Sequence, residues 1–466
     1  MQQLTLKQKI AYGIGAVGKD MVYALSANYV LYYYKDIIGL SSSFVGLILM
    51  IARIFDAVND PFMGILVAKT RTRWGRFRPW LFTGTVLNAL VLYALYAAPH
   101  GLSEAGMMIF FTVIYILWGM TYTMMDIPYW SMIPALTNTP DETENLSVIG
   151  RTCAGVGAAI MAMGTMMAVE ALGGGNERTG FQWLALIVAA VFVVTEVICC
   201  AFVREREDPG KMETTSVGQM FRALFRNDQA LIVVLSIILI NCALYLTSNL
   251  IIFFFKYDMG GMGWKGNYTI FSTVGGAMQI VGMMVVYPLL RKFKSNTFIF
   301  RVSLGLAMLG YLLILVLCMA GASGSLLLIC LPGALVFTAN GILSVLTTVF
   351  LSNSVDYGEL KTGHREESVI FSMQTFVVKA ASGFSVFAAG VGLDLIGLVG
   401  NSEETEIIEV QTPETLLGLR LLMTLIPIAL LIAAYFIFLR RFKLSDETVA
   451  ANSEELKARH LAETGE

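Results

Sequence analysis

Long apolar segments, each about the length needed to cross a bilayer, limit most strongly what this chain can fold into. A membrane-spanning helix needs about 20 predominantly apolar residues. Twelve segments meet this requirement, at residues 10–35, 44–68, 79–98, 107–134, 148–171, 182–203, 229–255, 268–290, 297–319, 325–350, 367–399 and 413–439. Because backbone groups in lipid must be satisfied within the segment, we expect an all-α polytopic membrane protein with twelve transmembrane helices.

The composition agrees with a membrane protein and excludes some partners. Of the 466 residues, 56% are hydrophobic and 14% are charged, whereas soluble domains carry about 25% charged residues. The net charge of -2 argues against nucleic acid as a partner. The six cysteines fall in apolar segments without metal-ligand spacing, so we interpret them as packing residues. The start, MQQLTLKQKIAYG, lacks the pattern of a cleavable signal.

A charged segment divides the twelve spans into two sets of six. It covers residues 204–228 and is predicted to be a cytoplasmic middle loop between a bundle at 1–203 and a bundle at 229–440. Residues 441–466 are predicted to be a cytoplasmic tail. Two six-helix halves that rock around a midplane site are the layout of major facilitator transporters. We find no convincing sequence repeat between the halves.

Basic residues predict the orientation of the chain, because cytoplasmic loops collect lysine and arginine. The loop TRTRWGRFRPW, the middle loop and the segment after the last span are rich in them. The loops on the other side, APHGLSEAG, AGASGS and VGNSEETEIIEVQTPE, contain none. Both termini are therefore predicted to be cytoplasmic.

Ionisable residues inside the predicted spans mark the candidate site, because a charge at the bilayer centre costs on the order of 2.5 kcal/mol or more. Most of them belong to the first half, and the second half contributes mainly Lys379. In the first half we single out Lys19, Asp20, Arg53, Asp56, Asp60, Asp126 and Arg151.

One group of these residues predicts a site for a small monovalent cation. Asp56, Asn59 and Asp60 are spaced i, i+3, i+4 and therefore face one side of a helix. Two close carboxylates repel each other unless a proton or a cation intervenes. Thr123, in the span 107–134, offers a hydroxyl oxygen. The alternative is a structural network in which buried arginines neutralise the aspartates.

A second group predicts a sugar site. A sugar binds an aromatic face through its C–H groups, carboxylates through its hydroxyls, and cationic or amide donors. The first half supplies all three kinds of side chain, from Lys19, Asp20, Tyr122, Asp126, Trp130 and Arg151. The alternative role of the aromatic residues is packing or anchoring at the membrane interface.

Six motifs in this order resemble the melibiose-type carriers of the glycoside–pentoside–hexuronide:cation symporter family. They are YGIGAVGKD, ARIFDAVNDPFMG, TRTRWGRFRPW, YILWGMTYTMMDIPYWS, VDYGELKTGHREES and MQTFVVKA, and they cover nearly the whole chain. The resemblance implies a major facilitator fold. It also implies uptake of a galactoside such as melibiose, coupled to Na+, Li+ or H+.

The same resemblance implies roles for individual residues. It assigns the cation to Asp56, Asn59, Asp60 and Thr123. It assigns the sugar to Lys19, Asp20, Asp126, Trp130 and Arg151, with support from Tyr122 and, in the second half, Gln374, Thr375 and Lys379. Ala27 stands where a sugar-facing tyrosine is expected, and residues 325–350 contain no tryptophan. The exact glycoside therefore stays open.

Other functions are weighed against sugar symport. Another glycoside, a pentoside or a hexuronide is the alternative substrate, because Lys19, Arg151 and Lys379 would suit a sugar carboxylate. The dense polar centre argues against a lipid carrier. An enzyme is not expected, since the three histidines lie outside the spans and no nucleophile or metal-ligand set is present. We expect a monomer in a bacterial cytoplasmic (inner) membrane, with no cofactor beyond the coupling ion.

Overall fold

The computed structural model describes residues 4–137, 140–203, 217–261, 263–363, 367–400 and 409–464. Two compact units divide the chain. One comprises Met1–Thr214 with Leu398–Val410, and the other comprises Thr215–Gly397 with Gln411–Glu466. The described residues are helical, with no strand beyond an isolated bridge between Thr72 and Gly75.

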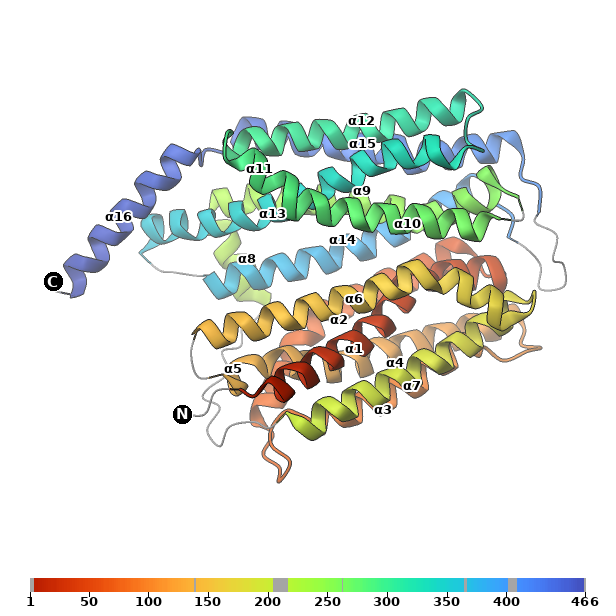
Figure 1. Ribbon diagram of the computed structural model, residues 1–466, viewed down its shortest axis with the longest axis horizontal. Helices are drawn as coiled ribbons and strands as arrows, with labels where there is room; N and C mark the ends of the chain where they lie inside the picture. Colours follow the sequence, from red (N-terminus) through yellow and green to blue (C-terminus); the bar gives the residue numbers. More distant parts are fainter. Residues whose placement is uncertain are drawn as a thin grey trace. The chain divides into compact units, whose positions relative to one another are not determined.

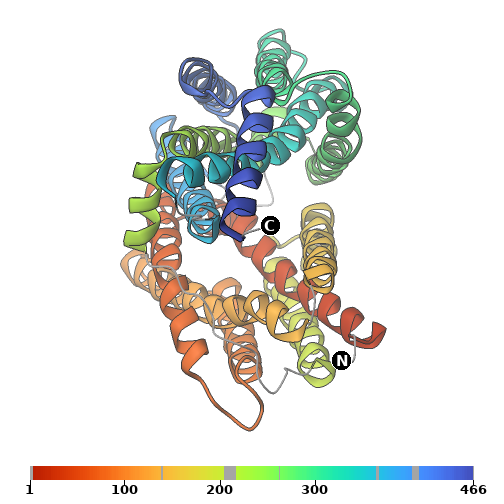
Figure 2. The ribbon, with the colours of Figure 1, turned by 90° about the vertical axis from the view of Figure 1, so that its left-hand side faces the viewer.

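Six long helices form the first unit (Figure 1). They are α1 (Leu6–Tyr32), α2 (Ser42–Lys69), α3 (Arg78–Tyr96), α4 (Glu104–Ser131), α6 (Pro140–Gly173) and α7 (Glu177–Phe202), with the short α5 (Ile133–Leu136) between α4 and α6 and a π-helical segment, η1 (Tyr33–Ile37), after α1. Polar caps begin several of them: Thr5, Ser41 and Ser103 each accept a backbone N–H of the first turn, which satisfies an otherwise unpaired donor. Helix α1 packs mainly against α6 and α7, and Figure 2 shows α6 nearly end-on with α1 running obliquely beside it.

Six helical segments in the described part of the second unit are long and apolar enough to cross a membrane. Its elements are α8 (Val217–Arg226), α9 (Asp228–Phe253), η2 (Phe254–Met259), α10 (Trp264–Val281), η3 (Gly282–Val286), α11 (Tyr287–Arg291), α12 (Asn296–Met319), α13 (Leu326–Thr362), α14 (Glu367–Leu395), α15 (Pro413–Arg441) and α16 (Asp446–Thr464). Its core is apolar and lies between α9, α12, α13 and α15, where residues such as Ile237, Phe300, Leu346 and Phe438 are fully buried.

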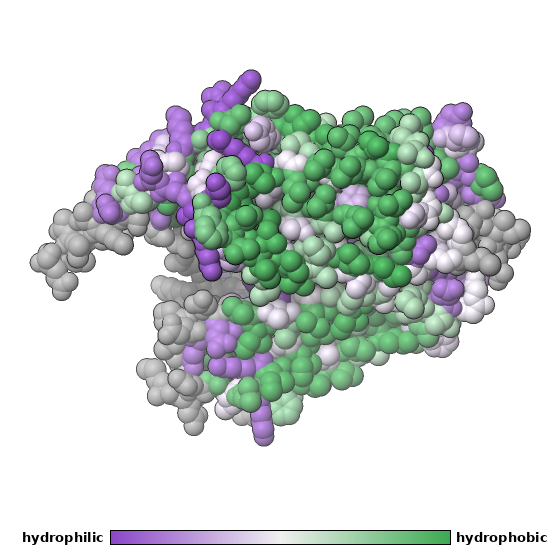
Figure 3. Space-filling view, turned by 45° about the horizontal axis from the view of Figure 1, so that its top comes forward, coloured by the Kyte–Doolittle hydropathy of each residue, from purple (hydrophilic) through white to green (hydrophobic). Residues whose placement is uncertain are grey.

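Eleven helices of the described chain are long and apolar enough to cross a membrane, and they match the second to twelfth predicted spans. Helix α1 has the required length, but Lys19 and Asp20 make it less apolar. Much of α1 is buried, so its polar side chains need not face lipid. Apolar side chains cover the helix surfaces and hydrophilic ones gather near the helix ends (Figure 3). The all-α fold with two six-helix bundles is thereby confirmed.

No convincing sequence repeat relates the whole halves, but one short segment is similar in both. NYVLYYYKDIIG, at 28–39, aligns without a gap to NLIIFFFKYDMG, at 249–260. Both segments turn from α-helix into π-helix after the aromatic run begins. Both end in a left-handed glycine, Gly39 with φ 87° and Gly260 with φ 63°. The first helix of each bundle therefore ends in the same way.

Candidate functional site

Lys19 is the centre of a buried polar cluster in the first unit. Its Nζ lies 2.7 Å from Asp126 Oδ1 and 3.0 Å from Asp20 Oδ2, and it donates to the Tyr122 hydroxyl at 3.3 Å. Only 2% of Lys19 is exposed, so the ammonium group depends on these partners in place of water. Helix α1 supplies Lys19 and Asp20, and α4 supplies the other two.

Trp130 forms an aromatic wall beside this cluster. Its Nε1 donates to Asp126 Oδ1 at 3.1 Å, as the i, i+4 spacing on α4 allows. Lys19 Nζ lies 5.1 Å from the Trp130 ring centroid, and Arg151 Cζ of α6 lies 5.3 Å from it, both within cation–π range. The structure therefore brings together all six sugar-site candidates of the first half.

The cation-site candidates lie where α2 faces α4. Thr123 Oγ1 donates to Asp60 Oδ1 at 3.5 Å. Asp56 is 8% exposed, and its carboxylate lies against Gly119: a Cβ on Gly119 would be 2.7 Å from Asp56 Oδ1. Asn59 is half-buried on the same helix. Both carboxylates of α2 therefore face α4, as their spacing predicts.

Tyr23 connects these two groups and was missed from the sequence. Arg53 Nη1 donates to the Tyr23 hydroxyl at 3.3 Å, and the guanidinium Cζ lies 5.0 Å from that ring centroid. The Tyr23 ring lies 5.5 Å from the Tyr122 ring. Arg53 also interacts electrostatically with Asp56. The position of Tyr23, four residues after Lys19 on the same helix face, was the signal that could have found it.

The second-half candidates lie on α14. Gln374 Nε2 donates to Thr348 Oγ1 of α13 at 3.4 Å, Thr375 is exposed and Lys379 is half-buried.

The expectation that Lys379 is the main charge of the second half was incomplete. Arg420 of α15 binds Asp258 of η2 through two hydrogen bonds, Nε to Oδ2 at 2.8 Å and Nη2 to Oδ1 at 2.6 Å. Asp258 lies just beyond the predicted span 229–255, whereas Arg420 lies inside the predicted span 413–439 and was overlooked. The pair links α15 to the end of the first helix of this unit.

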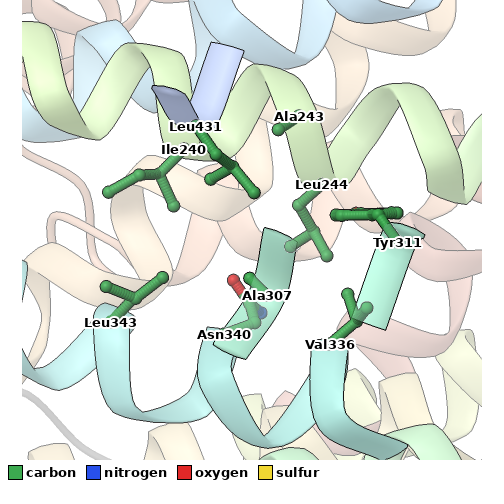
Figure 4. Close-up of a pocket in the computed structure, with 9 residues that line it drawn as sticks. All are labelled: Ile240, Ala243, Leu244, Ala307, Tyr311, Val336, Asn340, Leu343 and Leu431. Atoms are coloured by element: carbon green, nitrogen blue, oxygen red, sulfur yellow. The ribbon is translucent and has the colours of Figure 1, made fainter. Parts of the chain in front are cut away.

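A small cavity in the second unit is not a sugar site. It measures about 20 Å³, which is room for a water molecule. Its walls come from α9, α12, α13 and α15 and are apolar apart from the Asn340 amide and the Tyr311 hydroxyl (Figure 4). The other lining residues are Ile240, Ala243, Leu244, Ala307, Val336, Leu343 and Leu431.

Comparisons with known proteins agree with a transporter. The family model for MFS/sugar transport proteins matches residues 11–446. The inner membrane symporter YicJ of Escherichia coli strain K12 is 28% identical over 381 residues, which cover 82% of this chain and 81% of that protein. The lactose permease of Lactobacillus helveticus is 27% identical over 480 residues, covering 97% of this chain and 72% of the permease.

A solved structure shows the same fold. The crystal structure of a bacterial homologue of the human lysosomal transporter Spinster, inward-facing and unoccupied, superimposes with a TM-score of 0.66 at 13% sequence identity. The match covers 96% of this chain and 97% of that one. The family model spans nearly all of the sequence and both six-helix bundles. The chain belongs to the MFS/sugar transport protein family.

Proposed function

We propose that this protein is a symporter that couples inward movement of Na+, Li+ or H+ to uptake of a galactoside such as melibiose. The observation that carries the proposal is the double role of α4. Thr123 contacts Asp60 of the cation group, and Asp126, three residues later, holds Lys19 of the sugar group. Two ligands that bind along one helix segment are placed to influence each other's affinity.

The cation would act by removing carboxylate repulsion. Asp56 and Asp60, with Asn59 and Thr123, offer oxygen atoms on adjoining helices. A cation held there would neutralise the close negative charges and fix α2 against α4. That would set the position of Asp126, one turn beyond Thr123, for the sugar.

The sugar would exchange hydrogen bonds with the cluster around Lys19. Its hydroxyls would bind Asp20 and Asp126, and its C–H face would lie on Trp130. Lys19 is already shared by two carboxylates, so a neutral glycoside is favoured over an anionic sugar.

A second candidate is the same symport of another glycoside, a pentoside or a hexuronide. One observation favours it: Arg151 is exposed and lies over Trp130, where it would suit a uronate carboxylate. The names of the relatives, a symporter and a lactose permease, agree with both candidates.

The setting proposed for this activity is a bacterial cytoplasmic membrane, with the protein acting as a monomer. The basic loops support cytoplasmic termini. The functional halves would be residues 1–203 and 229–440, joined by the middle loop 204–228, with a tail at 441–466. Gln374, Thr375 and Lys379 are proposed as further sugar ligands on the sequence resemblance alone.

Uptake of labelled melibiose by cells, with and without sodium, tests the function. We expect sodium to stimulate uptake, and Asp60→Cys to abolish the stimulation because one of two cation-binding carboxylates is lost. Glu104→Cys, at the exposed start of α4, is the matched control and should behave as wild type.

Competition by unlabelled sugars then ranks the substrates. Preferential competition by a uronate would favour the second candidate. Sodium stimulation that survives Asp60→Cys would remove Asp60 from the cation site. A wild-type protein that transports no glycoside would refute the proposed function.

A further inference from the structure

Glu196 of α7 is a buried carboxyl that the proposed sugar and cation sites do not use. It is 1% exposed, and neither Oε1 nor Oε2 finds a hydrogen-bond partner among the described residues. A Cβ on Gly15 of α1 would lie 3.3 Å from Glu196 Oε2 and 3.3 Å from Tyr129 Cε2. The missing side chain at Gly15 thus leaves room for the carboxyl between α1, α4 and α7.

The hydroxyl donors around Glu196 are already used by the backbone. Tyr12 donates to the Tyr129 carbonyl at 3.1 Å, and Tyr129 donates to the Tyr12 carbonyl at 2.6 Å. Their rings stack at 4.5 Å, which fixes both. Thr195 donates to the Phe192 carbonyl at 2.9 Å. An ionised Glu196 would therefore be without water and without a donor, and such a charge is costly to bury.

Tyr129 connects Glu196 to the sugar cluster. Lys19 Nζ lies 5.6 Å from the Tyr129 ring centroid, and the same ring borders the space at Gly15 beside the Glu196 carboxyl. Lys19 is the cation that interacts electrostatically with Glu196, and Asp20 and Asp126 are the anions that do so. The titratable or charged groups around it are Tyr12, Lys19 and Asp20 on α1, Asp126 and Tyr129 on α4, Cys199 and Cys200 on α7, and Arg78 on α3 beyond the two cysteines. In the structure the charge of Lys19 is shared by two aspartates.

We propose that Glu196 is a protonation site whose proton is released when sugar binds. While Lys19 is paired with Asp20 and Asp126, the Glu196 carboxyl holds its proton. When sugar hydroxyls take over the two aspartates, more of the Lys19 charge is left to stabilise a Glu196 carboxylate. The O–H bond then breaks, its electron pair stays on the carboxylate, and the proton is released to the bulk solvent. This inference rests on the proposed sugar site.

Sugar binding and protonation of Glu196 oppose each other. The sugar-bound protein holds fewer protons than the free protein, so sugar affinity falls as the pH is lowered. One linked proton allows at most about a tenfold change in affinity per pH unit. By reciprocity, sugar makes Glu196 more acidic to the same extent.

Calorimetry of melibiose binding in buffers of different protonation enthalpy measures the released protons. Wild type should release protons, and Glu196→Gln should release fewer than half as many while still binding melibiose. Glu177→Gln is the matched control, because Glu177 lies on the same helix but accepts a hydrogen bond from the Tyr32 hydroxyl at 2.6 Å. Equal proton release by wild type and Glu196→Gln, or none by wild type, overturns the inference.

Infrared spectroscopy tests the protonated carboxyl without any sugar. Wild type should show the C=O stretch of a buried carboxylic acid. The band should be missing in Glu196→Gln and shifted in Glu196→Asp. If one of the two variants folds poorly, the other still tests the assignment.

The two measurements separate the possible failures. A wild-type spectrum without the band refutes the protonation site, whatever the protein transports. A band that disappears in Glu196→Gln, in a protein that binds no glycoside, refutes the sugar proposal and with it the linkage, but not the protonated carboxyl.

Discussion

Asp126 shows how much of the site depends on one side chain. Its Oδ1 accepts from both Lys19 Nζ and Trp130 Nε1, so the ammonium group and the aromatic wall are oriented by the same atom. The Trp130 contact is predictable because both residues lie one turn apart on α4. The Lys19 contact joins α1 to α4, and the sequence predicts only that a buried lysine needs a carboxylate.

Gly119 controls the distance between α2 and α4 at the cation group. In Gly119→Ala the new Cβ would lie 2.7 Å from Asp56 Oδ1, which forces the carboxylate to move. We expect sodium stimulation of sugar uptake to fall by about tenfold, equivalent to about 1.4 kcal/mol of coupling. The comparison is Gly164→Ala on α6, where a Cβ meets nothing within 4 Å. Equal sodium stimulation in the two variants would contradict the role of Asp56.

Two residues missed from the sequence differ in whether they could have been found. Glu196 lies inside the predicted span 182–203, and an ionisable residue there is by default a candidate functional residue. The same rule that selected Asp126 would have selected it. Tyr129 is different, because its stacking on Tyr12 results from the packing of α1 on α4. The sequence of one helix does not predict such a contact.

At the scale of whole elements, glycines set how closely the helices of the first unit pack. A Cβ on Gly157 of α6 would overlap the backbone carbonyl oxygen of Val17 on α1. A Cβ on Gly180 of α7 would overlap the carbonyl oxygen of Val169 on α6. Small residues allow this backbone approach in membrane helices. The contact at Gly157 holds α1, which carries Lys19, against α6, and the contact at Gly180 holds α7 against α6.

Gly157→Ala should destabilise the protein, because backbone cannot move aside as a flexible side chain can. Overpacking of this kind costs about 1–3 kcal/mol. Gly155→Ala on the same helix is the control, since a Cβ there meets nothing within 4 Å. Thermal unfolding in detergent should show a lower melting temperature for Gly157→Ala alone. A similar melting temperature for both variants would contradict the proposed backbone contact.

Helix boundaries were harder to predict than the existence of the helices. The apolar segment 325–350 corresponds to α13, which continues to Thr362. Hydropathy detects the part of a helix that suits lipid, whereas the backbone hydrogen bonds of α13 continue through Asp356 and Lys361. Within the segment 268–290, α10 passes into η3 and α11. Hydropathy does not predict this change of helix type, because the segment stays apolar throughout.

At the scale of the whole molecule, the distribution of basic residues predicts that both termini are cytoplasmic. Green fluorescent protein fused to the C-terminus should fluoresce, and alkaline phosphatase fused there should be inactive. Alkaline phosphatase fused after Gly101, in the loop without lysine or arginine, should be active. The opposite pattern of activities would invert the topology and the proposed direction of transport.

The arrangement of six spans, a loop and six spans follows from hydropathy and charge alone. The repeated segment at 28–39 and 249–260 escaped notice because only Asn, Lys and Gly are identical at matching positions. Its likeness lies in what the residues do: an aromatic run, a π-helical turn and a left-handed glycine. The two segments are therefore recognised as similar from their backbone structure, because too few of their residues are identical.

The repeat also bears on the ancestry of the molecule. Duplication of a six-helix precursor would leave the same helix ending in each half. When this alignment is extended without a gap toward the N-terminus, Lys19 and Asp20 stand opposite Ile240 and Asn241. The first helices of the two halves therefore end alike, whereas the extended alignment places no charged residue of the second half opposite Lys19 and Asp20.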